Sequence, residues 1–112
     1  MRLLFVCSRN KWRSRTAEKI YEGINGYAVK SAGTEAGARV KVTAGLVGWA
    51  DLILCMEKKH VQRLREKFPE ELADKQLICL HITDDYTFMD PELIELLQAR
   101  LQEHLEAPGQ GT

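Results

Sequence analysis

Short apolar runs alternate with longer amphipathic stretches four times along this 112-residue chain. The apolar runs are Leu3–Val6, Tyr27–Ser31, Asp51–Met56 and Leu77–Ile82. Short runs of this kind are typical of strands buried on both faces of a parallel sheet, and the helices that connect such strands cover both faces. The alternation therefore predicts an α/β fold, with a four-stranded parallel sheet as the middle layer of a three-layer sandwich. The length fits a single domain over residues 1–112.

The stretches between these runs have helical spacing of their apolar residues. We expect helices over Ser14–Ile24, Val42–Trp49 and Glu57–Phe68. The last helix begins with Asp90 as its N-cap and Pro91 as its first residue, and Leu93, Leu97, Leu101 and Leu105 repeat along its buried face. The polar, glycine-containing residues 107–112 are expected to form a frayed tail.

Composition excludes several classes of function. The 16 basic and 16 acidic residues cancel, which argues against a nucleic-acid partner, and no apolar run approaches the length of a membrane span. The three cysteines are an odd number without a CxxC pair, so we expect a reducing cytoplasm rather than a disulfide framework. The three histidines form no metal-binding pattern, and we expect His60 and His104 on exposed helix faces.

The loop after the first apolar run separates a cysteine from an arginine by five residues. In a parallel sheet, ligands bind where strands end and helices begin, and Cys7 to Arg13 occupies that place. Five residues form a nest of inward-pointing amides that binds a tetrahedral dianion and favours the thiolate of Cys7. The Arg13 fork then holds two phosphoryl oxygens, and Ser14 donates a hydrogen bond to the sulfur. The predicted phosphate-binding residues are Ser8, Arg9, Asn10, Lys11, Trp12, Arg13 and Ser14.

Three segments make the chain similar to the low molecular weight protein tyrosine phosphatases. The family's phosphate loop is similar to the opening Leu4-Phe5-Val6-Cys7 with Asn10, Arg13-Ser14 and Thr16-Ala17-Glu18. Its SAGT segment resembles Ser31-Ala32-Gly33-Thr34. Its third strand is similar to Ala50-Asp51-Leu52-Ile53-Leu54 with Met56. The resemblance implies strand order 2-1-3-4. It also implies that Cys7 is the nucleophile, that Arg13 binds phosphate, that Asn10 steadies the loop and that Ser14 assists the thiolate.

The resemblance further implies a general acid after the fourth strand. The family has Asp-Pro-Tyr there, and this chain has Thr83-Asp84-Asp85-Tyr86. Aligning the tyrosine assigns the acid to Asp84 and replaces the family's proline by Asp85. Asp85 is the alternative acid, since a carboxyl on a loop suits proton transfer to a leaving group.

Two departures from the family pattern bear on the substrate. Arg9 and Arg15 stand where the family has glycine and proline, which favours strongly anionic substrates. Residues 35–49 are much shorter than the family's insert, which predicts a shallower, more open site. Trp49, Tyr86 and Phe88 are candidates for a replacement aromatic wall.

Together these residues predict a cysteine-dependent phosphatase that hydrolyses protein phosphotyrosine or small aryl phosphates through a cysteinyl-phosphate, with catalytic residues Cys7, Arg13 and Asp84. We expect no metal or cofactor, and inorganic phosphate, sulfate and vanadate as ligands. The alternatives are a phosphate-binding module with little turnover and a thioredoxin-coupled arsenate reductase. The reductase would need a relay from Cys55 to another nearby cysteine. A phosphocarrier is disfavoured because it has no need of Arg13.

Overall fold

All eight predicted elements are present in the structure, a computed structural model that describes residues 1–105. The strands are β1 (Arg2–Cys7), β2 (Ala28–Gly33), β3 (Leu52–Cys55) and β4 (Gln76–Cys79). The helices are α1 (Arg13–Tyr21), α2 (Ala44–Trp49), α3 (Lys58–Lys67) and α4 (Pro91–Leu101). The predicted tail, residues 107–112, lies outside the described residues.

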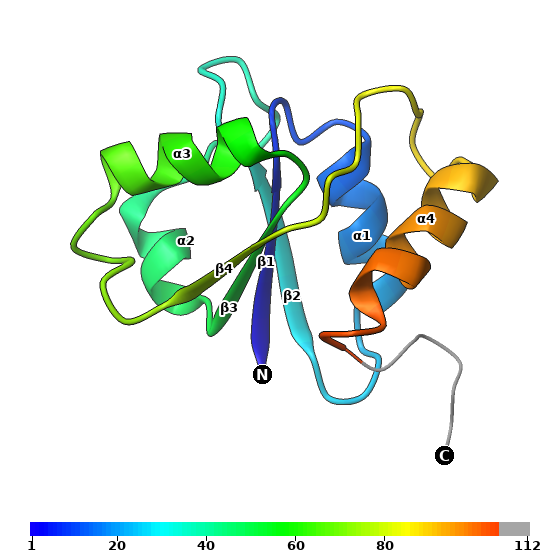
Figure 1. Cartoon of the computed structure of the whole chain (residues 1–112), viewed down its shortest axis with the longest axis horizontal. Helices are drawn as coiled ribbons and strands as arrows, with labels where there is room; N and C mark the ends of the chain where they lie inside the picture. Colours follow the sequence, from blue (N-terminus) through cyan, green and yellow to red (C-terminus); the bar gives the residue numbers. More distant parts are fainter. Residues whose placement is uncertain (106–112) are drawn as a thin grey trace.

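The four strands form one parallel sheet in the order β2-β1-β3-β4, which confirms the predicted fold class. Helices α1 and α4 cover one face of this sheet, and α2 and α3 cover the other (Figure 1). Because β1 is central and pairs on both sides, its carboxyl end opens between β2 and β3, where a ligand meets several loops.

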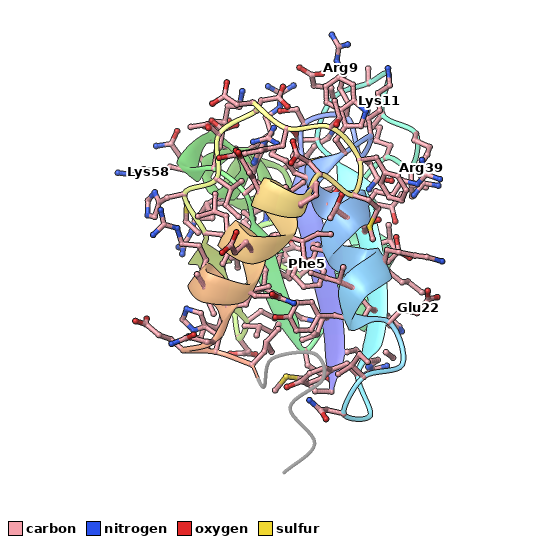
Figure 2. The ribbon with its side chains drawn as sticks, turned by 90° about the vertical axis from the view of Figure 1, so that its right-hand side faces the viewer. Phe5, Arg9, Lys11, Glu22, Arg39 and Lys58 are labelled. Atoms are coloured by element: carbon pink, nitrogen blue, oxygen red, sulfur yellow. The ribbon has the colours of Figure 1, made fainter. Side chains whose placement is uncertain are left out.

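Alternate residues of β1 enter two separate cores. Leu3, Phe5 and Cys7 belong to the cluster under α1 and α4, whereas Leu4 and Val6 belong to the cluster under α2 and α3. All but Cys7 are fully buried, which explains why this strand reads as a continuous apolar run rather than an alternating one. Figure 2 shows Phe5 inside the protein, behind α1 and α4.

Some boundaries differ from those predicted. Helix α1 ends at Tyr21 rather than Ile24, because Gly23 adopts a φ of 72° in the left-handed region and turns the chain toward β2. Leu105 follows α4 rather than belonging to it, yet its side chain is buried in the same cluster as Leu101. The Asp90 cap is confirmed, since its carboxylate accepts a hydrogen bond from the Glu92 amide at 3.0 Å. Within residues 1–105, no helix has the length and apolar character required to cross a bilayer.

Candidate active site

A pocket of about 310 Å³ opens at the carboxyl end of β1. Its lining residues are Cys7, Ser8, Arg9, Lys11, Trp12, Arg13, Glu35, Lys59 and Asp84. Of the predicted phosphate-binding residues, Asn10 and Ser14 do not line the pocket, and both are fully buried. The structure therefore brings the cysteine, the arginine and the expected acid to one cavity.

The Cys7 sulfur receives hydrogen bonds from two directions. The Asn10 amide donates to Sγ at 3.1 Å, and the Ser14 hydroxyl lies 3.0 Å from the same atom. Asn10 has a φ of 55°, and this left-handed conformation curls the loop so that its amide points back at the sulfur. The sulfur therefore has two hydrogen-bond partners within the loop before any ligand is bound.

A chain of hydrogen bonds beginning at Glu18 fixes the direction of the Ser14 hydroxyl. The Glu18 carboxylate can only accept, so Ser31 donates to it, and the Ser31 oxygen in turn accepts from the Asn10 side-chain amide at 2.8 Å. The same amide donates to Ser14 Oγ at 2.8 Å, so the Ser14 hydroxyl has its own hydrogen to donate. The nearer of its two acceptors is the Cys7 sulfur at 3.0 Å, and the other is the Ala32 carbonyl oxygen at 3.5 Å. One consequence is that Asn10 Oδ1 is buried without a partner among the described residues.

Only 2% of the Arg13 side chain is exposed, and groups from two segments, the start of α3 and the loop after β4, hold it. Nη1 donates to Glu57 Oε1 at 2.5 Å and to the carbonyl oxygen of Ile82 at 2.8 Å, and Nε lies 3.6 Å from Asp84 Oδ1. These contacts fix the guanidinium plane at the back of the pocket. Burial raises the pKa of Glu57, but the hydrogen bond and charge of Arg13 outweigh it, so the pKa lies below its ordinary value.

The sequence analysis missed four residues of the site. Glu35 and Lys59 line the pocket, and Glu57 and His60 lie at the start of α3 beside it. They form a reciprocal cap in which the Glu57 side chain accepts from the His60 amide and His60 Nδ1 accepts from the Glu57 amide at 3.0 Å. The prediction that His60 is a surface residue is wrong: it is 1% exposed, and its Nε2 lies 2.9 Å from Ser8 Oγ. Glu-x-x-His before an amphipathic stretch is the signal that would have identified this cap.

Acid should destabilise the protein through His60. Burial and then the nearby Arg13 charge lower the pKa of His60 from 6.5 to about 4. As the pH falls, the His60 ring therefore gains a proton in the unfolded state while it is still neutral in the folded state. The stability that this ring contributes is complete above pH 6.5 and is lost as the pH falls toward 4, by about 3 kcal/mol at most. Urea unfolding across this pH range will measure it.

The control for this prediction is His60→Gln, which has no titrating group at this position. Its free energy of unfolding should fall less steeply between pH 6.5 and 4 than that of the parent protein. Equal slopes in the two proteins would contradict a buried neutral histidine.

Residues 33–39 support the phosphate loop from the side. Gly33 packs so closely that an added Cβ would lie 2.6 Å from the Ser8 carbonyl oxygen and 2.7 Å from Ala38 Cβ. Arg39 donates from Nε to the Asn10 carbonyl oxygen at 3.2 Å, and Arg9 pairs with Glu35 at 3.1 Å. Arg9 and Lys11 extend from the end of the protein where β1 ends, and Arg39 lies below them (Figure 2).

The two carboxylates of the expected acid loop differ in position. Asp84 lines the pocket beside Arg13, with 60% of its side chain exposed. Asp85 is not among the lining residues, and its carboxylate accepts a hydrogen bond from Thr83 at 2.5 Å. The loop continues to Met89, whose amide donates to Thr16 of α1 at 2.9 Å and so ties the loop to the helix that begins at Arg13.

The three aromatic residues suggested as a wall lie elsewhere. Trp49 lies under Arg2 and Lys30, and Arg2 is the first residue of β1, at the end of the sheet opposite the pocket. Phe88 packs under the Arg15 guanidinium, and Tyr86 packs against the core below α1 and α4. The aromatic residue that lines the pocket is Trp12, with the Lys11 ammonium 5.1 Å from its ring centre.

The cysteines that a reductase relay would need are not arranged around Cys7. Cys55 belongs to the core under α2 and α3, on the face of the sheet opposite Cys7, and burial raises the pKa of its thiol to about 12. Cys79 is its register partner on β4. Within residues 1–105, no cluster of three or more potential metal ligands is present.

Comparison with solved structures identifies the fold family, although neither protein-family models nor curated proteins gave a match. The YwlE arginine phosphatase from Geobacillus stearothermophilus has 25% identity and a TM-score of 0.64, over 93% of this chain and 97% of that one. A C7S mutant of YwlE with a phosphorylated active-site serine has 23% identity and a TM-score of 0.66, over 93% and 97%. Vibrio vulnificus Wzb in complex with benzylphosphonate has 22% identity and a TM-score of 0.72, over 91% and 94%.

The solved structures that this chain resembles belong to the low molecular weight protein tyrosine phosphatase family. The resemblance predicted from the sequence is thereby confirmed, and so is the enzyme class, a phosphatase. At this level the chain is a cysteine-based phosphatase. The solved structures similar to it include complexes with phosphate, sulfate and benzylphosphonate. This chain departs from the loop pattern of that family at Arg9 and Arg15.

Proposed function

We propose that this protein hydrolyses phosphate monoesters of phenols, either phosphotyrosine in proteins or small aryl phosphates, through a cysteinyl-phosphate. The observation that carries the proposal is the Cys7 sulfur, which has two hydrogen-bond donors within 3.1 Å and shares a pocket with the buried Arg13. Free cysteines in the described chain suit a reducing compartment, so we place the activity in the cytoplasm.

In the first step the Cys7 thiolate attacks phosphorus in line with the leaving oxygen. The S–P bond forms as the P–O bond breaks, and Asp84 gives its proton to the departing phenol. The loop amides from Ser8 to Arg13 and the Arg13 fork stabilise the charge on the phosphoryl oxygens. In the second step the Asp84 carboxylate takes a proton from water, whose oxygen attacks phosphorus. The S–P bond breaks, and inorganic phosphate and the thiolate are released.

Two of the similar structures support this chemistry. The YwlE mutant carries a phosphorylated serine in its active site, which is a phosphoryl group held on a side-chain nucleophile. Wzb was solved with benzylphosphonate, a ligand with a tetrahedral phosphonate on an aromatic group. Both ligand states suit a loop in which a nucleophile lies below converging amides.

The charge of the rim favours a phenol over a guanidine as the leaving group. The pocket lining has more cations, Arg9, Lys11 and Lys59, than carboxylates, Glu35 and Asp84. Arg9 already pairs with Glu35. A guanidine becomes a cation when it leaves phosphorus, so the Lys11 and Lys59 ammonium groups would repel it. We expect a phosphotyrosine peptide to be hydrolysed faster than a phosphoarginine peptide of the same sequence.

Asp84→Asn should slow the hydrolysis of aryl phosphates by about 10²- to 10⁴-fold, because an amide has no proton to give the leaving oxygen. The loss should be largest for phenols of high pKa, which need protonation most. Rates for a series of substituted phenyl phosphates will measure it. Asp85→Asn is the matched control, and its rates should stay close to those of the parent, since Asp85 does not line the pocket. A larger loss in Asp85→Asn would transfer the acid role to that residue.

Hydrolysis of p-nitrophenyl phosphate between mildly acidic and neutral pH tests the function as a whole. We expect turnover that vanadate blocks competitively, since vanadate takes the geometry of the transferring phosphoryl group. A folded protein that binds phosphate without turnover would instead be a phosphate-binding module. Reduction of arsenate coupled to thioredoxin would identify the reductase.

A further inference from the structure

The side chain of Ser8 is linked to the start of α3 by a hydrogen-bonded histidine. Ser8 directly follows the candidate nucleophile, lines the pocket and is 8% exposed. Its Oγ lies 2.9 Å from His60 Nε2, and His60 Nδ1 accepts from the Glu57 amide at 3.0 Å. No other hydrogen-bond partner of Ser8 Oγ occurs within residues 1–105.

The backbone amide at the end of this chain dictates where each proton lies. An N–H group can only donate, so His60 Nδ1 must be an acceptor and the ring proton is on Nε2. Nε2 therefore donates to Ser8 Oγ, and the hydroxyl hydrogen of Ser8 is left for a different acceptor. The low pKa of His60, about 4, keeps the ring neutral at ordinary pH and preserves this direction.

The two serine hydroxyls of the loop thus have different roles. The Ser14 hydrogen is directed to the Cys7 sulfur by the chain from Glu18, whereas the Ser8 hydrogen has no protein acceptor within the described part of the chain. Ser8 lines the same cavity as Cys7 and Arg13. When a tetrahedral anion is bound there, one of its oxygens can accept the Ser8 hydroxyl hydrogen.

We propose that the Ser8 hydroxyl, oriented by His60, donates a hydrogen bond to an oxygen of the phosphoryl group bound over Cys7. Ser8 is then a substrate-contacting residue through its side chain as well as its amide, and His60 is a positioning residue that acts through Ser8. The inference rests on the proposed function for the identity of the anion, but it can be tested without turnover.

A double-mutant cycle on phosphate binding tests this proposal. Ser8→Ala, His60→Ala and the double variant are made in a Cys7→Ser background, and calorimetry measures the affinity of each for inorganic phosphate. Each single variant should bind about tenfold more weakly, the usual effect of one hydrogen bond to a charged group. The double variant should bind no more weakly than Ser8→Ala, because both changes remove the same contact.

Two further variants separate positioning from general damage to the fold. His60→Gln retains an N–H donor and should recover most of the affinity lost in His60→Ala. Leu64→Ala, in the core beneath the same helix, should lower the free energy of unfolding but leave phosphate affinity unchanged. Additive losses in the cycle, or unchanged affinity in Ser8→Ala, would overturn the proposal. Lack of turnover in the parent protein would count against the proposed function alone.

Discussion

Cys7→Ser should abolish hydrolysis of p-nitrophenyl phosphate, with a fall in kcat of at least ~10⁴-fold, because an un-ionised hydroxyl is a far weaker nucleophile than a thiolate. The protein should still fold, since the Asn10 amide and the Ser14 hydroxyl can bond to an oxygen as they do to the sulfur. Phosphate binding should therefore survive the loss of turnover. Steady-state rates and calorimetric titration with phosphate measure the two properties separately.

Cys79→Ser is the matched control for this substitution, because it removes a thiol that lies on β4 and does not line the pocket. Its rates should equal those of the parent protein. Turnover that persists in Cys7→Ser would exclude the cysteinyl-phosphate route. A loss shared by both variants would indicate a general effect of thiol removal.

Arg13→Ala should remove both activity and stability. The guanidinium holds two phosphoryl oxygens in the proposed mechanism. We therefore expect kcat/KM to fall by about 10³-fold or more, which exceeds the usual loss when one hydrogen-bond donor to the transition state is removed. Truncation also leaves the Glu57 carboxylate without the partner that lowers its pKa. Breaking such a pair costs about 3 kcal/mol, and urea unfolding measures that loss.

A second substitution separates these two effects. Arg13→Ala with Glu57→Gln removes the unpaired charge, so the free energy of unfolding should recover while activity remains lost. Arg13→Lys keeps the charge but loses the planar fork, and about 10²-fold of the activity should be lost with it. Recovery of turnover in the double variant would show that Arg13 serves the fold rather than the chemistry.

The fold was predictable because its signals are local. The apolar run of β1, the cap at Asp90 and the periodic leucines of α4 each depend on neighbouring residues. Errors in boundaries arose where single backbone angles decide the outcome, as at Gly23 after α1. Local patterns define which element forms, but they define its last residue poorly.

The candidate site was predictable only in part. The loop from Cys7 to Arg13 is contiguous in sequence, so its spacing could be read directly. The contact between Ser8 and His60 joins residues 52 positions apart, and nothing local to either residue indicates it. Trp49 was an incorrect candidate for the aromatic wall. It is the last residue of a predicted helix, and its distance from the pocket depends on which end of the sheet that residue reaches.

The hydrogen-bond chain from Glu18 to the Cys7 sulfur has a consequence for the energetics of the reaction. In water, molecules around a forming anion must reorient, and that reorganisation is part of the activation barrier. Here the Ser14 hydroxyl already points toward the sulfur before any substrate arrives, because the chain from the Glu18 carboxylate through Ser31 and Asn10 dictates its direction. The free-energy cost of orienting these groups is met when the chain folds. Charge can then move between sulfur and phosphorus without further reorientation of the groups around the sulfur.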